Sequence, residues 1–359
     1  MTRAAPSARI LIARAGGVLE PAALPPELRE AVEREVRAAR AAACVQLRPA
    51  EVERILREAW KQPATKVLDA LEPEPLAVTP AAQIHRGELD GTPVAVKVRR
   101  PGVERSVRND LALLDGLAVP LRGAFPRLDA AAVLRDLRTL ALDELDLEHE
   151  ASQQRRVARA MRGIDGIAVP RTHGELAAET VLVSELLEGA TVADGARPPH
   201  ARRAARALAE AYRAAVLGAG LVPYDLRASH VVIAPDGTLG LLGTGVARAL
   251  DRDRAAAELA GLDALAAGDE DGFAGRVAGE TGLLGEDEAR AAHALLREVL
   301  GDLLAPDPPL DAAALRELSV RARGRAPEIV RLAGRAAARP EDLALGRAIG
   351  QLAAVVARF

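Results

Sequence analysis

A lysine at the end of a short apolar segment is the residue of this chain best suited to hold a phosphate. Lys97 follows Val-Ala-Val within residues 91–102, a stretch that ends in Arg-Arg-Pro-Gly. Only three of the 48 lysine and arginine residues are lysines. Because arginine supplies the positive charge elsewhere, this lysine indicates a need for a compact ammonium group with three donors. A surface lysine on an edge strand is the alternative that this segment alone leaves open.

Three further residues have side chains that could take part in chemistry. Asp225, in Pro-Tyr-Asp-Leu-Arg, could accept a hydroxyl proton, or it could cap a turn with Arg227 as its local partner. Glu150 lies in a helical segment crowded with charge, so a solvated position is the alternative to a role as partner of Lys97. His230 precedes Val-Val-Ile, which is more typical of a packed loop histidine than of a metal ligand.

Composition narrows the class of protein. The 359 residues carry a net charge of −3 and the sequence pI is about 6.2, so no overall field favours nucleic acid as a partner. The single cysteine, Cys44, cannot form an internal disulfide or a thiolate metal cluster, and it fits a reducing compartment. We expect no signal peptide and no transmembrane segment, because Arg347 and Arg358 interrupt the apolar stretch 343–359. A cytoplasmic location, with peripheral membrane contact as an option, is the expectation.

The order of predicted elements is helices, a small β-containing segment, and then mostly helices. Residues 27–43 and 49–60 have helical spacing, the Asp-Gly pair at 90–91 predicts a hairpin that ends in the Lys97 strand, and 181–187 is a buried strand. An amphipathic helix over 202–217 and a second hairpin around 231–242 follow. Low aromatic content with much alanine and arginine favours helices for the remainder.

Several motifs together resemble one kinase-like family. Val-Ala-Val-Lys97 is the third-strand signature of protein kinases, and Lys-Val-x-Arg-Pro-Gly102 with Ala82-Gln-Ile-His85 is similar to the UbiB/AarF/ADCK family of atypical kinases. Glu144-Leu-Asp146 followed by Glu150 resembles the family's Glu-x-Asp element and its helix glutamate. Glu144 and Asp146, two residues apart, cannot share a helix face and therefore predict a helix end or loop.

This resemblance implies a fold and a set of site residues. The fold is an α+β, two-lobed protein-kinase-like one, with an N-terminal helical extension at 1–70, a small β-containing lobe with a helical insert at 71–188, and a helical lobe at 189–359. Asp225 corresponds to the catalytic acid. The implied nucleotide-binding residues are Lys97, Glu150, Ala77, Val78, Thr79, Ala81, Glu185 and Leu187. The implied regulatory motif comprises Arg14, Gly16, Glu144 and Asp146.

The departures from the family pattern concern phosphate and metal binding. Arg14-Ala-Gly-Gly17 stands where the family has Lys-x-Gly-Gln, and the nucleotide loop contains Pro80, which has no N–H to offer a phosphate. His230 and Gly243 occupy the positions of the asparagine and the aspartate that hold magnesium. Imidazole is a poor magnesium ligand and glycine offers no side-chain oxygen, so we expect ATP or another nucleotide with magnesium absent or weakened.

The sequence and the resemblance leave two main function classes and a third, less favoured one. The first is a UbiB-type nucleotide-binding pseudokinase or very weak ATPase with a regulatory role, which the family links to isoprenoid-quinone or lipid metabolism. Its partners would be a nucleotide together with a protein, a lipid or a quinone. The second is an active atypical kinase or ATPase that uses Asp225 with a non-standard metal ligand. The third, a non-catalytic interaction module, leaves the joint match of Lys97 and Glu150 unexplained.

Overall fold

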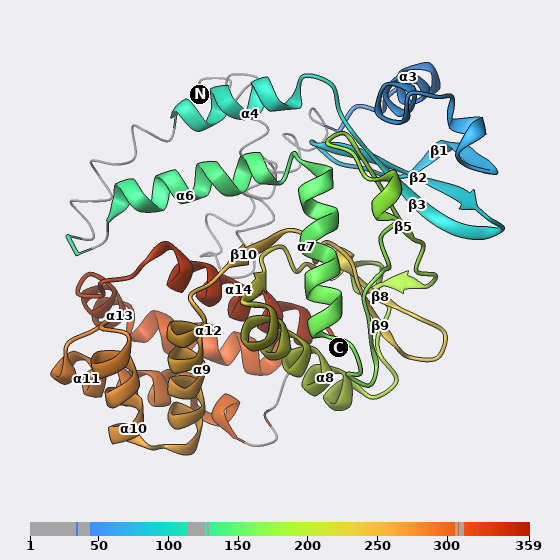
Figure 1. Ribbon diagram of the computed structural model, residues 1–359. Helices are drawn as coiled ribbons and strands as arrows, with labels where there is room; N and C mark the ends of the chain where they lie inside the picture. The colour runs from blue at the N-terminus through green and yellow to red at the C-terminus, as the bar shows by residue number, and fades with distance from the viewer. Residues whose placement is uncertain (1–33, 35–43, 114–125, 128, 306–307, 309–311) are drawn as a thin grey trace.

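The computed structural model describes residues 34, 44–113, 126–127, 129–305, 308 and 312–359, and Figure 1 shows a small sheet beside a larger helical part. The helix expected over 27–43, apart from Arg34, and the motif containing Arg14 and Gly16 lie outside these residues. The α+β organisation predicted from the sequence, a small β-containing part followed by a mostly helical part, is confirmed. The domain boundaries after residues 70 and 188 remain predictions.

The main sheet has four antiparallel strands in the order β1-β2-β3-β5. They are β1 (Ala70–Val78), β2 (Ala82–Leu89), β3 (Thr92–Arg99) and β5 (Val181–Glu185). The predicted hairpin is confirmed: Asp90 and Gly91 have φ of 50° and 71°, the pair of positive values that a two-residue type I′ turn requires. β1 is not among the strands predicted from the sequence, and it contains Pro73 and Pro75. Proline is tolerated there because β1 lies at the sheet edge.

Alternation along β3 divides the sheet into two faces. Val94, Val96 and Val98 are fully buried against helix α3 (Pro49–Trp60), as the predicted amphipathic spacing of that helix requires. The indole N–H of Trp60 donates to the carbonyl of Leu176 at 2.9 Å and anchors the end of α3. Lys97 therefore lies on the opposite face of the sheet from α3.

Three α-helices lie between β3 and β5 in the part of this interval that the structure describes. They are α4 (Val103–Leu113), α6 (Ala130–Asp143) and α7 (Leu147–Ala160). In Figure 1, α7 runs from the main sheet toward the helical part, while α4 and α6 extend away from the sheet. Arg248 forms an ion pair with Asp136 of α6, which joins this insert to the strand β10 (Ala247–Ala249).

The helical part is built around a large apolar core with two small sheets at its edge. The expected helix and hairpin are present, as α8 (Ala201–Ala214) and as β8 (Val231–Ile233) with β9 (Leu239–Leu241). The remaining strands are β4 (Ile167–Ala168), β6 (Ala190–Thr191) and β7 (Leu221–Pro223). The remaining helices are α9 (Arg252–Ala267), α10 (Glu270–Ala274), α11 (Glu286–Leu300), α12 (Ala312–Gly324), α13 (Ala326–Ala333) and α14 (Pro340–Val356). Among the described residues, no helix is both long and apolar enough to span a membrane.

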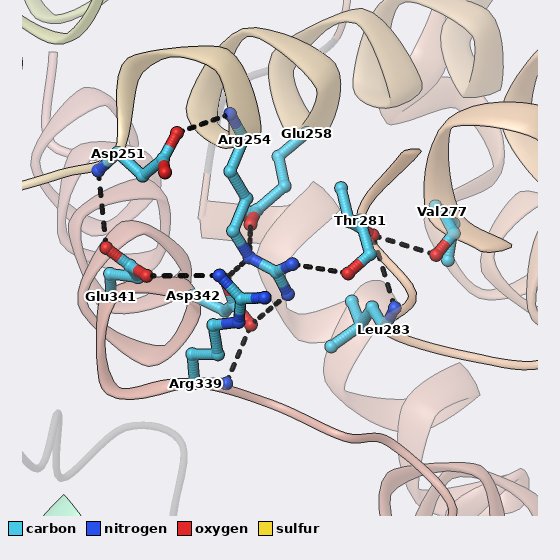
Figure 2. Close-up of polar contacts among 9 residues, drawn as sticks. All are labelled: Asp251, Arg254, Glu258, Val277, Thr281, Leu283, Arg339, Glu341 and Asp342. Carbon is cyan, nitrogen blue, oxygen red and sulfur yellow. Dashed lines mark hydrogen bonds and ion pairs between the residues drawn. The ribbon is translucent and has the colours of Figure 1, made fainter. Parts of the chain in front are cut away.

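A buried charge cluster joins α9 to α14 (Figure 2). Arg254 donates two hydrogen bonds to the carboxylate of Asp342, both at 2.6 Å, and a third to the carbonyl of Thr281. Glu258, one turn along α9, lies 3.4 Å from the Arg254 guanidinium. Burial, then a hydrogen bond to Asp342, raises the pKa of Glu258 to about 8. Burial acts in the same direction on Asp342, but hydrogen bonds from Arg254, Glu258 and the N–H of Arg339 together exceed it and lower the pKa of Asp342.

This cluster makes stability depend on pH. The folded protein keeps the proton of Glu258 at pH values where the unfolded chain, with an ordinary pKa of 4.5, has released it. The contribution of Glu258 is therefore complete below about pH 4.5 and is lost as the pH rises through about 8. We expect Glu258→Gln to flatten the fall in melting temperature between pH 5 and 9, measured by calorimetry. Exposed Glu53→Gln is the control, and an unchanged slope in Glu258→Gln would contradict the assignment.

Candidate functional site

The predicted pair of Lys97 and Glu150 is present. The Lys97 ammonium lies 2.6 and 2.8 Å from the two carboxylate oxygens of Glu150. The Glu150 side chain is only 5% exposed and that of Lys97 is 26% exposed. Lys97 lies mid-way along β3, where it pairs with Ile84 and Leu182 of the neighbouring strands, so its backbone is fixed on both sides. The pair thus joins the main sheet to α7, and one side of the ammonium stays open to solvent.

Asp146 fixes the start of α7 and thereby the position of Glu150. Its side chain accepts hydrogen bonds from the N–H groups of Glu148 and His149 at 3.0 and 3.1 Å, the pattern of an N-cap. Glu144 is the C-cap of the preceding helix, α6. The expectation that Glu144 and Asp146 lie at a helix end or loop is confirmed, and their regulatory role remains a prediction.

The turn that resembles the family's nucleotide loop has little backbone to offer a phosphate. It follows residues 77–78 at the end of β1. The N–H of Thr79 donates to the carbonyl of Ala82 at 2.8 Å, and the N–H of Ala82 donates to Thr79 Oγ1 at 2.9 Å. Pro80 has no N–H. At most the N–H of Ala81 is left to face an anion.

The Ala-Gln-Ile-His motif is a buried structural network. The Gln83 side chain accepts from the N–H of Leu47 at 2.7 Å and its amide lies 2.9 Å from Nε2 of His85. His85 Nδ1 lies 2.8 Å from the carbonyl of Glu72, which can only accept, so we assign the proton to Nδ1. Both side chains are almost completely buried. The motif therefore ties the segment before α3 to β1 and β2 and lies behind the site.

The segment after β5 leads from the sheet to the helical part. Glu185 pairs with Val94 of β3, and its carboxylate accepts a hydrogen bond from the N–H of Arg171 at 3.3 Å. Leu187 packs against Gly240 of β9, where a Cβ would come within 2.7 Å of its Cδ1. The structure thus places Glu185 on the sheet and Leu187 against the helical part, and contact of either residue with a nucleotide remains a prediction.

Asp225 is held by the arginine that follows it. Arg227 donates from Nε and Nη2 to the two carboxylate oxygens at 2.7 and 2.8 Å, a bidentate ion pair within one loop. The local partnership considered from the sequence is therefore real. Each carboxylate oxygen already accepts a hydrogen bond from Arg227, which leaves fewer lone pairs for a hydroxyl proton or a metal, so this geometry opposes both roles expected of the family's acid.

His230 is also committed within the same loop. Its Nδ1 lies 2.7 Å from the backbone carbonyl of Asp225, so this nitrogen carries the proton and cannot bind a metal. Burial lowers the pKa of His230, and the nearby charges of Arg227 and Lys97 act in the same direction, against the attraction of Asp225. The neutral imidazole is thus a packed loop residue.

The His230 ring occupies the space in which a side chain at position 243 would begin. Gly243 has φ of +69°, and a Cβ there would lie 2.9 Å from His230 Nδ1. Two residues on, a Cβ at Gly245 would meet the backbone carbonyl of Glu150 and come within 2.6 Å of its Cγ. The Gly-Thr-Gly segment therefore packs between His230 and Glu150, which brings Asp225, His230 and the Lys97–Glu150 pair into one contiguous site.

Magnesium, which a kinase fold implies, does not fit this donor set. Within the described residues no three side chains of His, Cys, Asp or Glu gather as a metal site. Gly243 offers no oxygen, Nδ1 of His230 is a donor, and both Asp225 oxygens accept from Arg227. Lys97 remains suited to an anionic phosphate, since its ammonium has a third donor direction beyond the two Glu150 oxygens.

The packing of His230 against Gly243 can be tested by substitution. We expect Gly243→Asp to lower the free energy of unfolding by more than the roughly 1–3 kcal/mol of a strained backbone, because the new Cβ also meets the imidazole. Adding His230→Asn, which shortens the side chain, should recover part of the loss. Urea unfolding of the two single variants and the double variant gives the coupling energy.

Gly91→Asp is the matched control for this cycle. Gly91 has φ of +71°, and nothing lies within 4 Å of the position that its Cβ would take. This variant therefore carries the backbone strain without the contact. Equal losses for Gly91→Asp and Gly243→Asp, or no coupling between positions 243 and 230, would contradict the packing described here.

Comparisons with known proteins agree with this geometry. The family model described as the ABC1 atypical kinase-like domain matches residues 41–275. An AarF domain-containing protein kinase 1 from Xenopus tropicalis is 28% identical over 188 residues, which cover 51% of this chain and 36% of the relative. A probable protein kinase UbiB from Vibrio campbellii is 36% identical over 126 residues, or 34% of this chain and 23% of the relative. The match thus spans little more than a third of the first relative and less than a quarter of the second.

A solved structure supports the fold over nearly the whole chain. The Rv3197–erythromycin complex from Mycobacterium tuberculosis superposes with a TM-score of 0.67, at 22% identity, and covers 96% of this chain and 86% of that one. The family match extends over well more than half of the chain and includes Lys97, Glu150, Asp225 and Gly243. This chain therefore belongs to the ABC1 family of atypical kinase-like proteins, the group that contains AarF, UbiB and ADCK proteins.

Proposed function

We propose that this protein is a UbiB-type nucleotide-binding pseudokinase, or at most a very weak ATPase. The observation that supports this proposal above all others is the packing of the His230 ring over Gly243, at the two positions where the family holds magnesium. The Lys97–Glu150 pair keeps the form that holds nucleotide phosphates in kinases. The pair that would hold nucleotide phosphates is thus retained, whereas the residues that would hold the catalytic metal are replaced.

Loss of charge neutralisation is expected to slow phosphoryl transfer. Phosphoryl transfer depends on a metal ion that neutralises the β- and γ-phosphates, and loss of one charge-stabilising group costs about 3 kcal/mol of transition-state stabilisation. Here two ligands are replaced, and Arg227 additionally engages the carboxylate of Asp225. The nucleotide loop has no backbone donor at Pro80. These changes together favour slow or absent turnover over a rearranged active centre.

Family resemblance supplies the biological setting of the proposal. UbiB-type proteins are linked to isoprenoid-quinone and lipid metabolism, so we infer a regulatory role there, in which nucleotide occupancy controls contact with a protein, a lipid or a quinone. We infer a cytoplasmic location with peripheral membrane contact. The chain spans only part of its curated relatives, and this role is accordingly proposed for the kinase-like portion that it contains.

Nucleotide titration with and without magnesium tests the proposal. We expect ATP to bind with an affinity that changes less than tenfold on adding magnesium, because Gly243 and His230 provide no oxygen ligand. Lys97→Met should weaken ATP binding in both conditions, and Lys66→Met is the control for loss of a lysine elsewhere. A gain of tenfold or more with magnesium, about 1.4 kcal/mol, would show that a replacement ligand exists.

The active atypical kinase is the second candidate, supported by the retention of Asp225. If it is correct, ATP hydrolysis should proceed at about 1 per second or faster, and Asp225→Asn should abolish it while ATP binding survives. Under the pseudokinase proposal the unmodified protein shows no such rate. Supplying ligands through His230→Asn with Gly243→Asp should then raise magnesium dependence. Hydrolysis at a kinase-like rate that is lost in Asp225→Asn would overturn the pseudokinase proposal.

A further inference from the structure

A second charged cavity lies where α3, the end of β3 and the start of α4 meet. Its volume is about 430 Å³. Two glutamates, Glu58 and Glu104, face it together with five arginines: Arg54, Arg99, Arg100, Arg105 and Arg108. The protein as a whole is slightly acidic, so this concentration of guanidinium groups is a local feature. Lys97 does not line the cavity, which is therefore separate from the nucleotide site.

The acidic residues of the cavity neutralise only part of its charge. Arg54 pairs with Glu58 and Arg108 with Glu104, each at 2.7 Å and each one helical turn apart. The side chains of Arg54, Glu58 and Arg108 are exposed and that of Glu104 is partly exposed, so water screens both ion pairs and keeps them weak. These pairs are weak enough to be exchanged for contacts with a more highly charged anion.

The other three arginines leave a net positive charge. Arg99 has a structural role, since it donates to the carbonyl of Leu145 at 2.7 Å and lies 2.9 Å from Glu179. Arg100 donates to the carbonyl of Val45, and burial lowers its pKa, which is the effect expected of a guanidinium that has lost water without gaining a carboxylate contact. Arg105 forms no hydrogen bond or ion pair with the part of the chain that the structure describes.

The dimensions of the cavity suit a small molecule with an anionic group. About 430 Å³ lies in the range of small-molecule sites and exceeds what a lone phosphate needs. Ile55 and Pro101 add apolar surface between the guanidinium groups. Guanidinium groups bind phosphate oxygens in a bidentate manner, and several of them around one cavity match a di- or trianion better than a carboxylate.

We propose that this cavity binds a phosphate-bearing small molecule, with Arg54, Arg100 and Arg105 as its main contacts. The bound ligand would lie beside the strand that carries Lys97, because Arg99 is two residues along β3. Arg99 in turn donates to the carbonyl of Leu145, which precedes the cap of α7. This site is additional to the nucleotide function proposed above and does not depend on it.

Pyrophosphate is the probe for the test, since it carries the shared chemistry without a base or a sugar. Isothermal titration of the full chain should show binding that weakens at least tenfold in Arg54→Gln/Arg105→Gln. Arg57→Gln is the matched control: Arg57 lies on the same helix and pairs with Glu53 at 3.0 Å, but it does not line the cavity. The affinity of Arg57→Gln for pyrophosphate should stay within twofold of that of the unmodified protein. The melting temperatures of all variants should agree within 2 °C.

A second arm separates this cavity from the nucleotide site. Pyrophosphate binding to the cavity should persist in Lys97→Met, and it should compete with sulfate. If binding is lost in Lys97→Met and unchanged in Arg54→Gln/Arg105→Gln, the anion occupies the nucleotide site and the proposal is wrong. Absence of any binding to the unmodified protein at 10 mM pyrophosphate would overturn it equally.

Sedimentation with vesicles tests whether the phosphate group belongs to a lipid headgroup or to a free small molecule. Phosphatidylcholine vesicles with and without phosphatidylglycerol present the same group as a lipid headgroup. We expect no capture beyond that of the neutral vesicles, which would assign the cavity to a free phosphorylated molecule. Capture by the anionic vesicles that is lost in Arg54→Gln/Arg105→Gln but kept in Arg57→Gln would assign the cavity to a headgroup. Capture that is equal in both variants, with no pyrophosphate binding, would contradict the site.

Discussion

The ion pair of Lys97 and Glu150 is the interaction on which the arrangement of this molecule depends. A carboxylate that is 5% exposed is costly to bury, and the Lys97 ammonium makes that burial tolerable only if the sheet and α7 keep their relative positions. Three other contacts keep the sheet and α7 in these positions. The three buried valines hold β3 against α3, Asp146 sets the first turn of α7, and Gly245 lets the following loop pack directly on the helix.

The two halves of the site differ in what their residues contact. Among the residues that the structure describes, the Lys97 ammonium contacts only Glu150, whereas Asp225 contacts Arg227 and Nδ1 of His230 contacts the carbonyl of Asp225 within one loop. The first half of the site has a donor available to an anion, and the oxygens of the second half already accept hydrogen bonds. The difference arises from few residues: Arg227, His230 and Gly243 account for it, while the backbone around them keeps the kinase-like course.

Local patterns made much of this structure predictable. The Asp-Gly hairpin, α3, α8 and the helix break at Glu144 and Asp146 all follow from spacing and turn chemistry over a few residues. The Lys97–Glu150 contact was predictable because two separate motifs fitted one family. The edge strand β1, with two prolines, was missed because its strand character depends on pairing with β2. The contact of His230 with Gly243 depends on how two loops cross, so no local pattern reveals it. The arginine-lined cavity joins Arg54 of α3 to four arginines at residues 99–108, and their proximity depends on how α3 packs on the sheet.

Mutual packing of residues 230 and 243 also constrains how this sequence can change over time. An aspartate introduced first at 243 meets the imidazole, and an asparagine introduced first at 230 gives up the packed ring while no carboxylate is yet present. Neither single substitution thus provides a pair of metal ligands, and only the two substitutions together could provide one. The two positions are therefore coupled, and we expect the effect of a substitution at either one to depend on the residue at the other.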